Sequence, residues 1–289
     1  MLVKEEVLGV NKKTKSLATI LSLCVVLLIV LSVVLLNVNK KEEPVADNPV
    51  VDNNVTEVIE EVEYTDDYYR DFFNSQKAIN EDYMGQLFFK SGLIVQPFVQ
   101  GETNGTYLRT DWRNGKYDVE GSNFMDADCD VDSHNLVIYG HYVFEYLDPT
   151  LSHKFTALEQ LLDEENYKDN NIIYLLLEDE IREYEIASVS YVQLIKIGND
   201  YYTEDDFQYY LNDYSEVYFD SYHDKVKRLE QYDTGVDFTY DDKLLTLQTC
   251  TRNREDMREI VICVLRNTYK LDGKCTFEKY DLANSERFE

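Results

Sequence analysis

The spacing of apolar residues predicts a mostly β domain over residues 64–289. Short apolar runs bounded by Gly, Pro, Asn or Asp have the length and composition of strands. These runs fall at 85–99, 106–112, 135–144, 171–177, 183–189, 243–250 and 260–265. Apolar residues three or four positions apart predict helices instead, at 64–83, at 155–162 and within 202–230.

Residues 17–36 follow a different pattern, an uncharged and almost wholly apolar run. A helix of this length reaches about 30 Å, the thickness of a bilayer core. Lysines cluster in residues 1–16, which predicts a cytoplasmic tail. A cleaved signal peptide is the competing interpretation, but its apolar core is normally shorter and ends at small residues. We therefore expect an uncleaved, single-pass anchor in the cell membrane, with the remaining chain outside the cell.

Residues 37–63 have the composition of an acidic, flexible linker. They hold two prolines and many Asp, Asn and Glu residues, with only scattered Val and Ile. Such a segment buries too little apolar surface to offset the entropy of ordering. The whole chain carries a net charge of −28, which excludes nucleic-acid binding because that function requires a basic surface.

The candidate chemistry lies in 243–266, KLLTLQTCTRNREDMREIVICVLR. A predicted strand ends on Cys250, a polar loop rich in arginine follows, and a second strand begins. Positive charge near a cysteine favours its reactive thiolate form. The alternative is that Cys250 is a small buried residue, as most free cysteines are.

A second segment, NLVIYGHYVF at 135–144, ends a predicted strand on Gly140 and His141. Together, VIYGH, TLQTC and a following arginine resemble the sortases, the cysteine transpeptidases of Gram-positive cell surfaces. The order histidine, cysteine, arginine is the order in that family. The segments QGETNGTYLRTDW and GSNFMDAD, and the run YDTGVDFTYDDKLLTLQTC, resemble class B members. The resemblance covers nearly all of 64–269.

The resemblance implies a sortase-like β-barrel with peripheral helices, among them an N-terminal helix and a helix inserted before the cysteine strand. It implies His141, Cys250 and Arg258 as catalytic residues. Asn104, Leu108 and Thr249 are assigned to the substrate groove. Tyr142 stands where the family commonly has asparagine, which affects the expected detail of the groove.

The choice of arginine depends on position. Arg258 lies eight positions after Cys250, slightly nearer than is usual in the family, so Arg252 and Arg254 compete with it. We assign the role to Arg258 because it opens the apolar strand, and rigid elements hold catalytic geometry better than loops.

Alternating aspartates in DADCDVD, 126–132, offer carboxylate oxygens of the kind that calcium prefers. The spacing fails the EF-hand template, since valines stand at the glycine and glutamate positions. We therefore expect a solvated acidic loop and no metal. We expect no structural disulfide and no cofactor.

Taken together, the sequence predicts a membrane-anchored cysteine transpeptidase with an extracellular catalytic domain. By resemblance, its partners are a C-terminal sorting signal of the Asn-Pro-x-Thr-x kind and an amine of peptidoglycan. Two alternatives stay open: a sortase that polymerises pilins, and a membrane-tethered binding ectodomain without catalysis.

Overall fold

The structure is a computed structural model that describes residues 66–143, 154–198, 200–251, 256–277 and 280–285. The chain divides into two units, 1–60 and 61–289, and every described residue belongs to the second. The predicted tail, anchor and linker lie outside the described residues. Within the described ranges, no helix has both the length and the apolar character needed to cross a bilayer.

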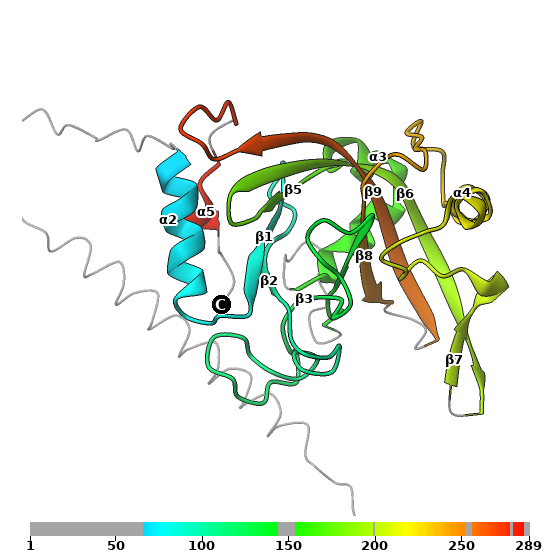
Figure 1. Ribbon diagram of the computed structural model, residues 1–289. Helices are drawn as coiled ribbons and strands as arrows, with labels where there is room; N and C mark the ends of the chain where they lie inside the picture. Colours follow the sequence, from blue (N-terminus) through cyan, green and yellow to red (C-terminus); the bar gives the residue numbers. More distant parts are fainter. Residues whose placement is uncertain (1–65, 144–153, 199, 252–255, 278–279, 286–289) are drawn as a thin grey trace, which may run out of the picture. The chain divides into compact units, whose positions relative to one another are not determined.

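The described chain forms a nine-stranded sheet in the order β5-β1-β2-β3-β4-β8-β9-β6-β7. A further pairing of β5 with β6 closes the first eight of these strands into a barrel, while β7 pairs with the far end of β6 (Figure 1). The mostly β prediction and the barrel are thereby confirmed. The strands are β1 (Tyr83–Phe89), β2 (Val95–Val99), β3 (Phe124–Met125), β4 (Asn135–Tyr139), β5 (Ile172–Leu176), β6 (Glu180–Ile197), β7 (Asp200–Thr203), β8 (Leu244–Cys250) and β9 (Met257–Lys270).

Helices lie at the periphery, as expected. They are α2 (Asp66–Lys77), the 3₁₀ helix η1 (Thr156–Leu162), α3 (Glu164–Asp169), the 3₁₀ turn η2 (Glu204–Asp206), α4 (Glu216–Leu229) and α5 (Leu282–Ser285). Helix α4 begins after Ser215, whose hydroxyl accepts a hydrogen bond from the backbone N–H of Tyr218 and caps the helix. This is the predicted helix ahead of the cysteine strand.

Two predicted strands differ from the structure. The run 85–99 is two antiparallel strands, β1 and β2, because the chain turns at Gly92, whose φ of 82° suits glycine. The run 106–112 is a series of turns with one bridge between Thr110 and Tyr117. Its apolar residues differ in exposure: Tyr107 and Trp112 are buried, whereas Leu108 is 42% exposed.

Strands β6 and β9 extend well beyond their predicted apolar runs. They pair antiparallel from Glu180 opposite Lys270 to Gln193 opposite Met257. Ladder hydrogen bonds join backbone groups, so polar residues continue the pairing where the apolar run has ended. The apolar pattern alone therefore underestimated both strands, and it did not predict the short strands β3 and β7.

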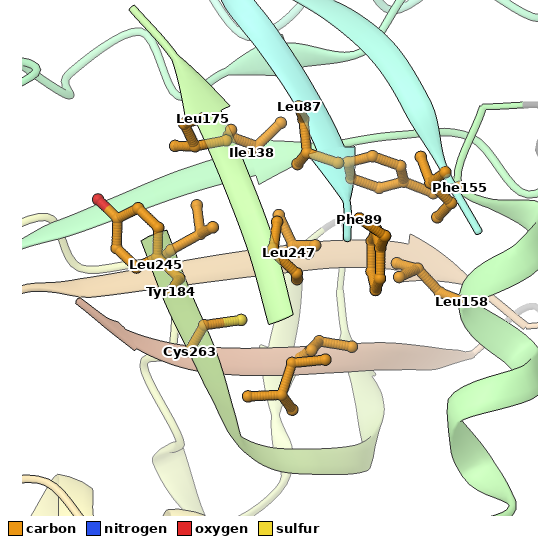
Figure 2. Close-up of a cluster of buried hydrophobic side chains, with 14 of the residues drawn as sticks. Leu87, Phe89, Ile138, Phe155, Leu158, Leu175, Tyr184, Leu245, Leu247 and Cys263 are labelled. Carbon is orange, nitrogen blue, oxygen red and sulfur yellow. The ribbon is translucent and has the colours of Figure 1, made fainter. Parts of the chain in front are cut away.

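The barrel interior is one apolar cluster to which strands on opposite sides contribute. Figure 2 shows Leu87, Leu175, Leu245, Leu247 and Cys263 directed toward one another. Phe155 and Leu158, at and beside the start of η1, close one end of this cluster. A second cluster packs α4 and residues 207–214 against the outer faces of β6, β8 and β9. Strand β8 is thus covered on both faces, and its alternating side chains belong to different clusters.

Candidate active site

Cys250 is the last residue of β8 and is half-buried. Side chains alternate along a strand, so Cys250 shares its face with Gln248 and lies opposite the interior residue Leu247. The thiol is thereby directed to the outer face of the barrel. The other described cysteines are free as well. Among them, Cys263 is fully buried in the interior, and burial raises the pKa of its thiol well above the usual value.

Arg258 faces Cys250 across the β8–β9 ladder, where the two residues are direct partners. Residues in such pairs have Cα atoms about 5 Å apart and side chains on the same face. The guanidinium Nη1 donates a hydrogen bond to the carbonyl of Met257 at 2.8 Å. Arg252 and Arg254, the competing arginines, lie outside the described residues.

His141 follows β4, the other neighbour of β8. Strands β4 and β8 are parallel, with Tyr139 beside Gln248, and the N–H of Gly140 donates to the carbonyl of Gln248 at 3.0 Å. His141 comes two residues after Tyr139, as Cys250 comes two residues after Gln248. Because parallel strands run in one direction, the imidazole and the thiol emerge at the same end of neighbouring strands.

Gly140 is required at this turn by close packing. A Cβ atom at this position would lie 2.4 Å from the ring of Phe155 and 2.7 Å from the side-chain oxygen of Asn123. Those distances are far below normal contact, so a larger residue would displace the segment that leads into His141.

The imidazole of His141 is held by the loop that contains Leu108. Its Nε2 lies 2.8 Å from the carbonyl oxygen of Leu108, and a carbonyl only accepts hydrogen bonds. Nε2 therefore carries a proton, which leaves Nδ1 as the nitrogen with a free lone pair in the neutral ring. Burial lowers the pKa of His141, and the positive charges of Arg109 and Lys154 lower it further, while the Leu108 hydrogen bond opposes the shift.

Tyr209 and Gln248, which were not selected from the sequence, lie near the thiol. The buried Tyr209 donates its hydroxyl to Oε1 of Gln248 at 2.7 Å. Burial raises the pKa of Tyr209, although the nearby positive charge of Arg258 opposes the shift, so the phenol stays a donor. Nothing in the sequence distinguishes Tyr209 among 24 tyrosines; its role depends on a contact with a distant strand.

The residues assigned to the groove have three different placements. Asn104 uses its side chain within the protein: Nδ2 donates to Asp126 at 2.9 Å, and Oδ1 accepts from the N–H of Ala127 at 2.7 Å. Leu108 lies beside His141 with its side chain exposed. Thr249 is 1% exposed and faces the interior, away from Cys250, so the geometry does not support its assignment to the groove.

The acidic loop at 126–132 is only partly solvated, as a correction to the expectation. Asp128, Asp130 and Asp132 are exposed to solvent, whereas Asp126 is 6% exposed and hydrogen-bonded. Within the described residues, no three His, Cys, Asp or Glu side chains gather as metal ligands.

The arrangement as a whole suits acyl transfer. A thiol, an imidazole and a guanidinium lie at the same end of three adjacent strands. Thiol and base form an activated nucleophile, and a guanidinium offers charged N–H donors to a developing oxyanion.

Comparison with known proteins gives one group of relatives, although no family model matches the chain. Sortase B of Staphylococcus aureus is 27% identical over 206 residues, covering 69% of this chain and 76% of that protein. Sortase B of Listeria monocytogenes is 26% identical over 189 residues, covering 64% of this chain and 70% of that protein.

Solved structures give the same result. The Staphylococcus aureus sortase B–substrate complex matches with a TM-score of 0.57 and 25% identity, covering 68% of this chain and 86% of the other. Clostridium perfringens sortase B matches with a TM-score of 0.56 and 23% identity, covering 67% and 99%. The latter likeness concerns the fold alone.

Proposed function

This chain belongs to the class B sortases, and from that premise we propose that it is a cysteine transpeptidase acting on surface proteins. The observation that carries the proposal is the direct pairing of Cys250 with Arg258, with His141 at the same end of the neighbouring parallel strand. Each group has a separate role in the chemistry.

The first half-reaction is acylation of the thiol. The Cys250 sulfur, as thiolate, attacks a peptide carbonyl carbon, and the carbonyl electrons move to oxygen. The Arg258 guanidinium donates hydrogen bonds to that oxyanion. The oxyanion then collapses, the carbon–nitrogen bond breaks, and protonated His141 gives its Nδ1 proton to the leaving amine. The products are a thioester on Cys250 and a free amine.

The second half-reaction reverses these roles. An incoming amine attacks the thioester carbon and loses a proton to Nδ1 of His141, and the carbon–sulfur bond breaks to release the thiolate. A new amide joins the protein to the acceptor, and no cofactor is needed for either step.

The proposed substrate is a C-terminal sorting peptide of the Asn-Pro-x-Thr-x kind, and the proposed acceptor is an amine of peptidoglycan. Support comes from relatives: one sortase B has been solved with its substrate, and another sortase B structure is a complex with triglycine. We further propose that residues 17–36 anchor the enzyme in the cell membrane, with its catalytic domain outside, on the strength of the apolar run.

Fluorogenic sorting peptides, incubated with the soluble domain, test the activity. We expect cleavage that is lost by at least about a thousandfold in Cys250→Ala, since the nucleophile is removed. Arg258→Ala should lose about a hundredfold or more. Arg252→Ala and Arg254→Ala are the matched controls and should retain activity.

Two results would contradict the proposal. Equal turnover in wild type and Cys250→Ala would remove the thiol from the mechanism. Peptide binding without any turnover would favour the binding-ectodomain alternative. A third result, loss of activity in Arg254→Ala alone, would show that the assignment of Arg258 is wrong.

A further inference from the structure

The buried carboxylate of Asp126 touches segments that lead to each side of the candidate site. We propose that Asp126 is a positioning residue for His141, because it fixes the two segments that hold the imidazole and joins them to the wall that carries Tyr209. The inference rests on the proposed function for its effect on turnover, but the placement of His141 can be measured without turnover.

Asp126 lies just after β3, is 6% exposed and accepts four hydrogen bonds. Oδ2 accepts from Nδ2 of Asn104 at 2.9 Å and from the Tyr139 hydroxyl at 2.8 Å. Oδ1 accepts from the N–H of Asp128 at 3.0 Å and from Nδ2 of Asn212 at 3.4 Å. All four donors are neutral, so direction and distance, and not charge pairing, fix the carboxylate among them.

The first connection to His141 runs through Asn104. Asp126 and the N–H of Ala127 hold both ends of the Asn104 carboxamide, which pins the loop at this residue. Four residues later, the carbonyl of Leu108 accepts the Nε2 hydrogen bond of His141. The position of that carbonyl therefore depends on how firmly Asn104 is held.

The second connection runs through Tyr139. This residue ends β4, two positions before His141, and its hydroxyl is bound to Asp126. Burial raises the pKa of Tyr139, and the negative charge of Asp126 raises it further, so the phenol remains protonated and donates. The strand end that carries His141 is thus bound to the same carboxylate as the loop whose Leu108 carbonyl accepts the hydrogen bond of the imidazole.

The third connection reaches the wall of the site. Asn212, bound to Asp126, also accepts a hydrogen bond from the Cys129 thiol at 3.0 Å, and its backbone carbonyl accepts from the N–H of Asn135 at 2.9 Å. Three residues earlier on this segment is Tyr209, whose hydroxyl binds the β8 residue two positions before the thiol. One carboxylate therefore sets the relative positions of the imidazole and of the segment over the thiol strand.

The test uses substitutions that keep size but change hydrogen bonding. In Asp126→Asn one carboxylate oxygen becomes an N–H₂ group, so two of the four donors lose their acceptor. These are Asn104 and Tyr139 in one amide orientation, or Asp128 and Asn212 in the other, and each pair belongs to a connection described above. We expect kcat/KM to fall about 10- to 100-fold, mainly through kcat, because a small displacement of a catalytic base has an effect of that order. The double variant Asp126→Asn/Asn104→Asp exchanges acceptor and donor and should recover most of the loss. The control is Asp128→Asn, an exposed position in the same loop with the same loss of charge, which should behave as wild type.

A second readout does not need activity. The Leu108 hydrogen bond raises the pKa of His141, so weakening it should lower that pKa. We expect the imidazole resonances of His141, followed by NMR titration, to move their midpoint to lower pH in Asp126→Asn and to return in the double variant. A purely structural role would lower the melting temperature without moving the midpoint of the folded protein.

Unchanged His141 midpoints and an unchanged kcat/KM in folded Asp126→Asn would overturn the proposal. If the wild type itself shows no thiol-dependent turnover, the proposed function fails, and the titration alone decides the placement of His141. Tyr139→Phe is the milder variant should Asp126→Asn not fold. It keeps the ring packing on Phe124 and removes one hydrogen bond, and a midpoint equal to wild type would count against the proposal.

Discussion

The two faces of the β8–β9 ladder share one backbone but place very different groups in very different surroundings. The outer face presents Gln248, Cys250 and Arg258, which are polar and at least partly accessible. The inner face presents Leu247, Thr249 and Glu259, each at most 1% exposed. Adjacent residues on one strand thus differ in whether solvent can reach them, and a position next to Cys250 is not thereby accessible from outside the barrel.

Glu259 is the exception on the inner face, because it is a carboxyl group in an apolar interior. Among the described residues, its Oε1 has no hydrogen-bond partner, and neither has Oγ1 of Thr249, its neighbour across the ladder. Burial raises the pKa of Glu259 well above the usual value, and the negative charge of Glu159 raises it further. Tyr191, which pairs with it from β6, also faces this carboxyl.

The largest expected difference between the faces is in stability. Leu247→Ala should lower the free energy of unfolding by about 2–5 kcal/mol, because it opens a cavity in the barrel interior. Cys250→Ala, on the outer face, should lower it by about 1 kcal/mol or less. Urea denaturation of both variants measures the contrast, and equal losses would mean that the faces are not distinct environments.

Because of Glu259, the inner face should also make the free energy of unfolding depend on pH. Its carboxyl keeps its proton to higher pH in the folded state than in the unfolded chain. Below the ordinary pKa of about 4.5, the Glu259 carboxyl therefore makes its full contribution to the free energy of unfolding. That contribution is lost as pH rises toward the pKa of the carboxyl in the folded state. In Glu259→Gln this loss should be absent. The free energy of unfolding of the variant, relative to that of the wild type, should therefore increase as pH rises.

Chemical denaturation from about pH 4.5 to about pH 8 measures this effect over the range in which an ordinary glutamate loses its proton and beyond. Glu178→Gln, at an exposed position in the turn between β5 and β6, is the matched control. A constant difference in unfolding free energy between wild type and Glu259→Gln across this range would show that Glu259 does not titrate with folding.

Thr249 gives a smaller effect. Thr249→Val replaces a buried hydroxyl that has no partner among the described residues by a methyl group. The unfolding free energy should therefore change by no more than about 1 kcal/mol and in the stabilising direction. We expect kcat/KM to stay at the wild-type value, since the side chain faces away from Cys250. A raised KM in Thr249→Val would restore the assignment of this residue to the substrate groove.

The smallest expected effect concerns the charge beside His141. Arg109 lowers the pKa of His141, so Arg109→Gln should raise it. The side chain of Arg109 is exposed, and solvent ions screen exposed charges, so we expect a small effect. Because protonated His141 is the proposed acid, the alkaline limb of kcat/KM should move slightly to higher pH. Raising the salt concentration screens the Arg109 charge, so it should move the alkaline limb of the wild type in the same direction. A shift to lower pH in Arg109→Gln would show that Arg109 does not lower the pKa of His141.

Short, local patterns were sufficient to predict much of this molecule. The apolar runs around Cys250 and His141 indicated β8 and β4, and the segments TLQTC and VIYGH indicated the barrel through resemblance. The roles of His141, Cys250 and Arg258 stay predictions, but their strands are neighbours, as those roles require. The inward direction of Thr249 could also have been predicted, since alternation along a strand places it opposite Cys250.

Other features depend on contacts that no local pattern contains. Tyr209 is paired with a residue 39 positions away, and Asp126 binds Asn212 at a separation of 86. Asp126 is one of four alternating aspartates, and only its burial distinguishes it from the others. The turns at 106–112 were mistaken for a strand because buried Tyr107 and Trp112 frame the exposed Leu108 in what looks like a strand composition.

The parallel pairing of β4 with β8 has a consequence for how the protein is made. Thr246 on β8 donates its hydroxyl to Asn135 on β4 across a sequence separation of 111 residues. During synthesis the imidazole leaves the ribosome long before the thiol does, and the guanidinium follows later still. A nascent chain or fragment that stops ahead of residue 258 therefore lacks one of the three groups, and the candidate site cannot assemble until that residue has been synthesised.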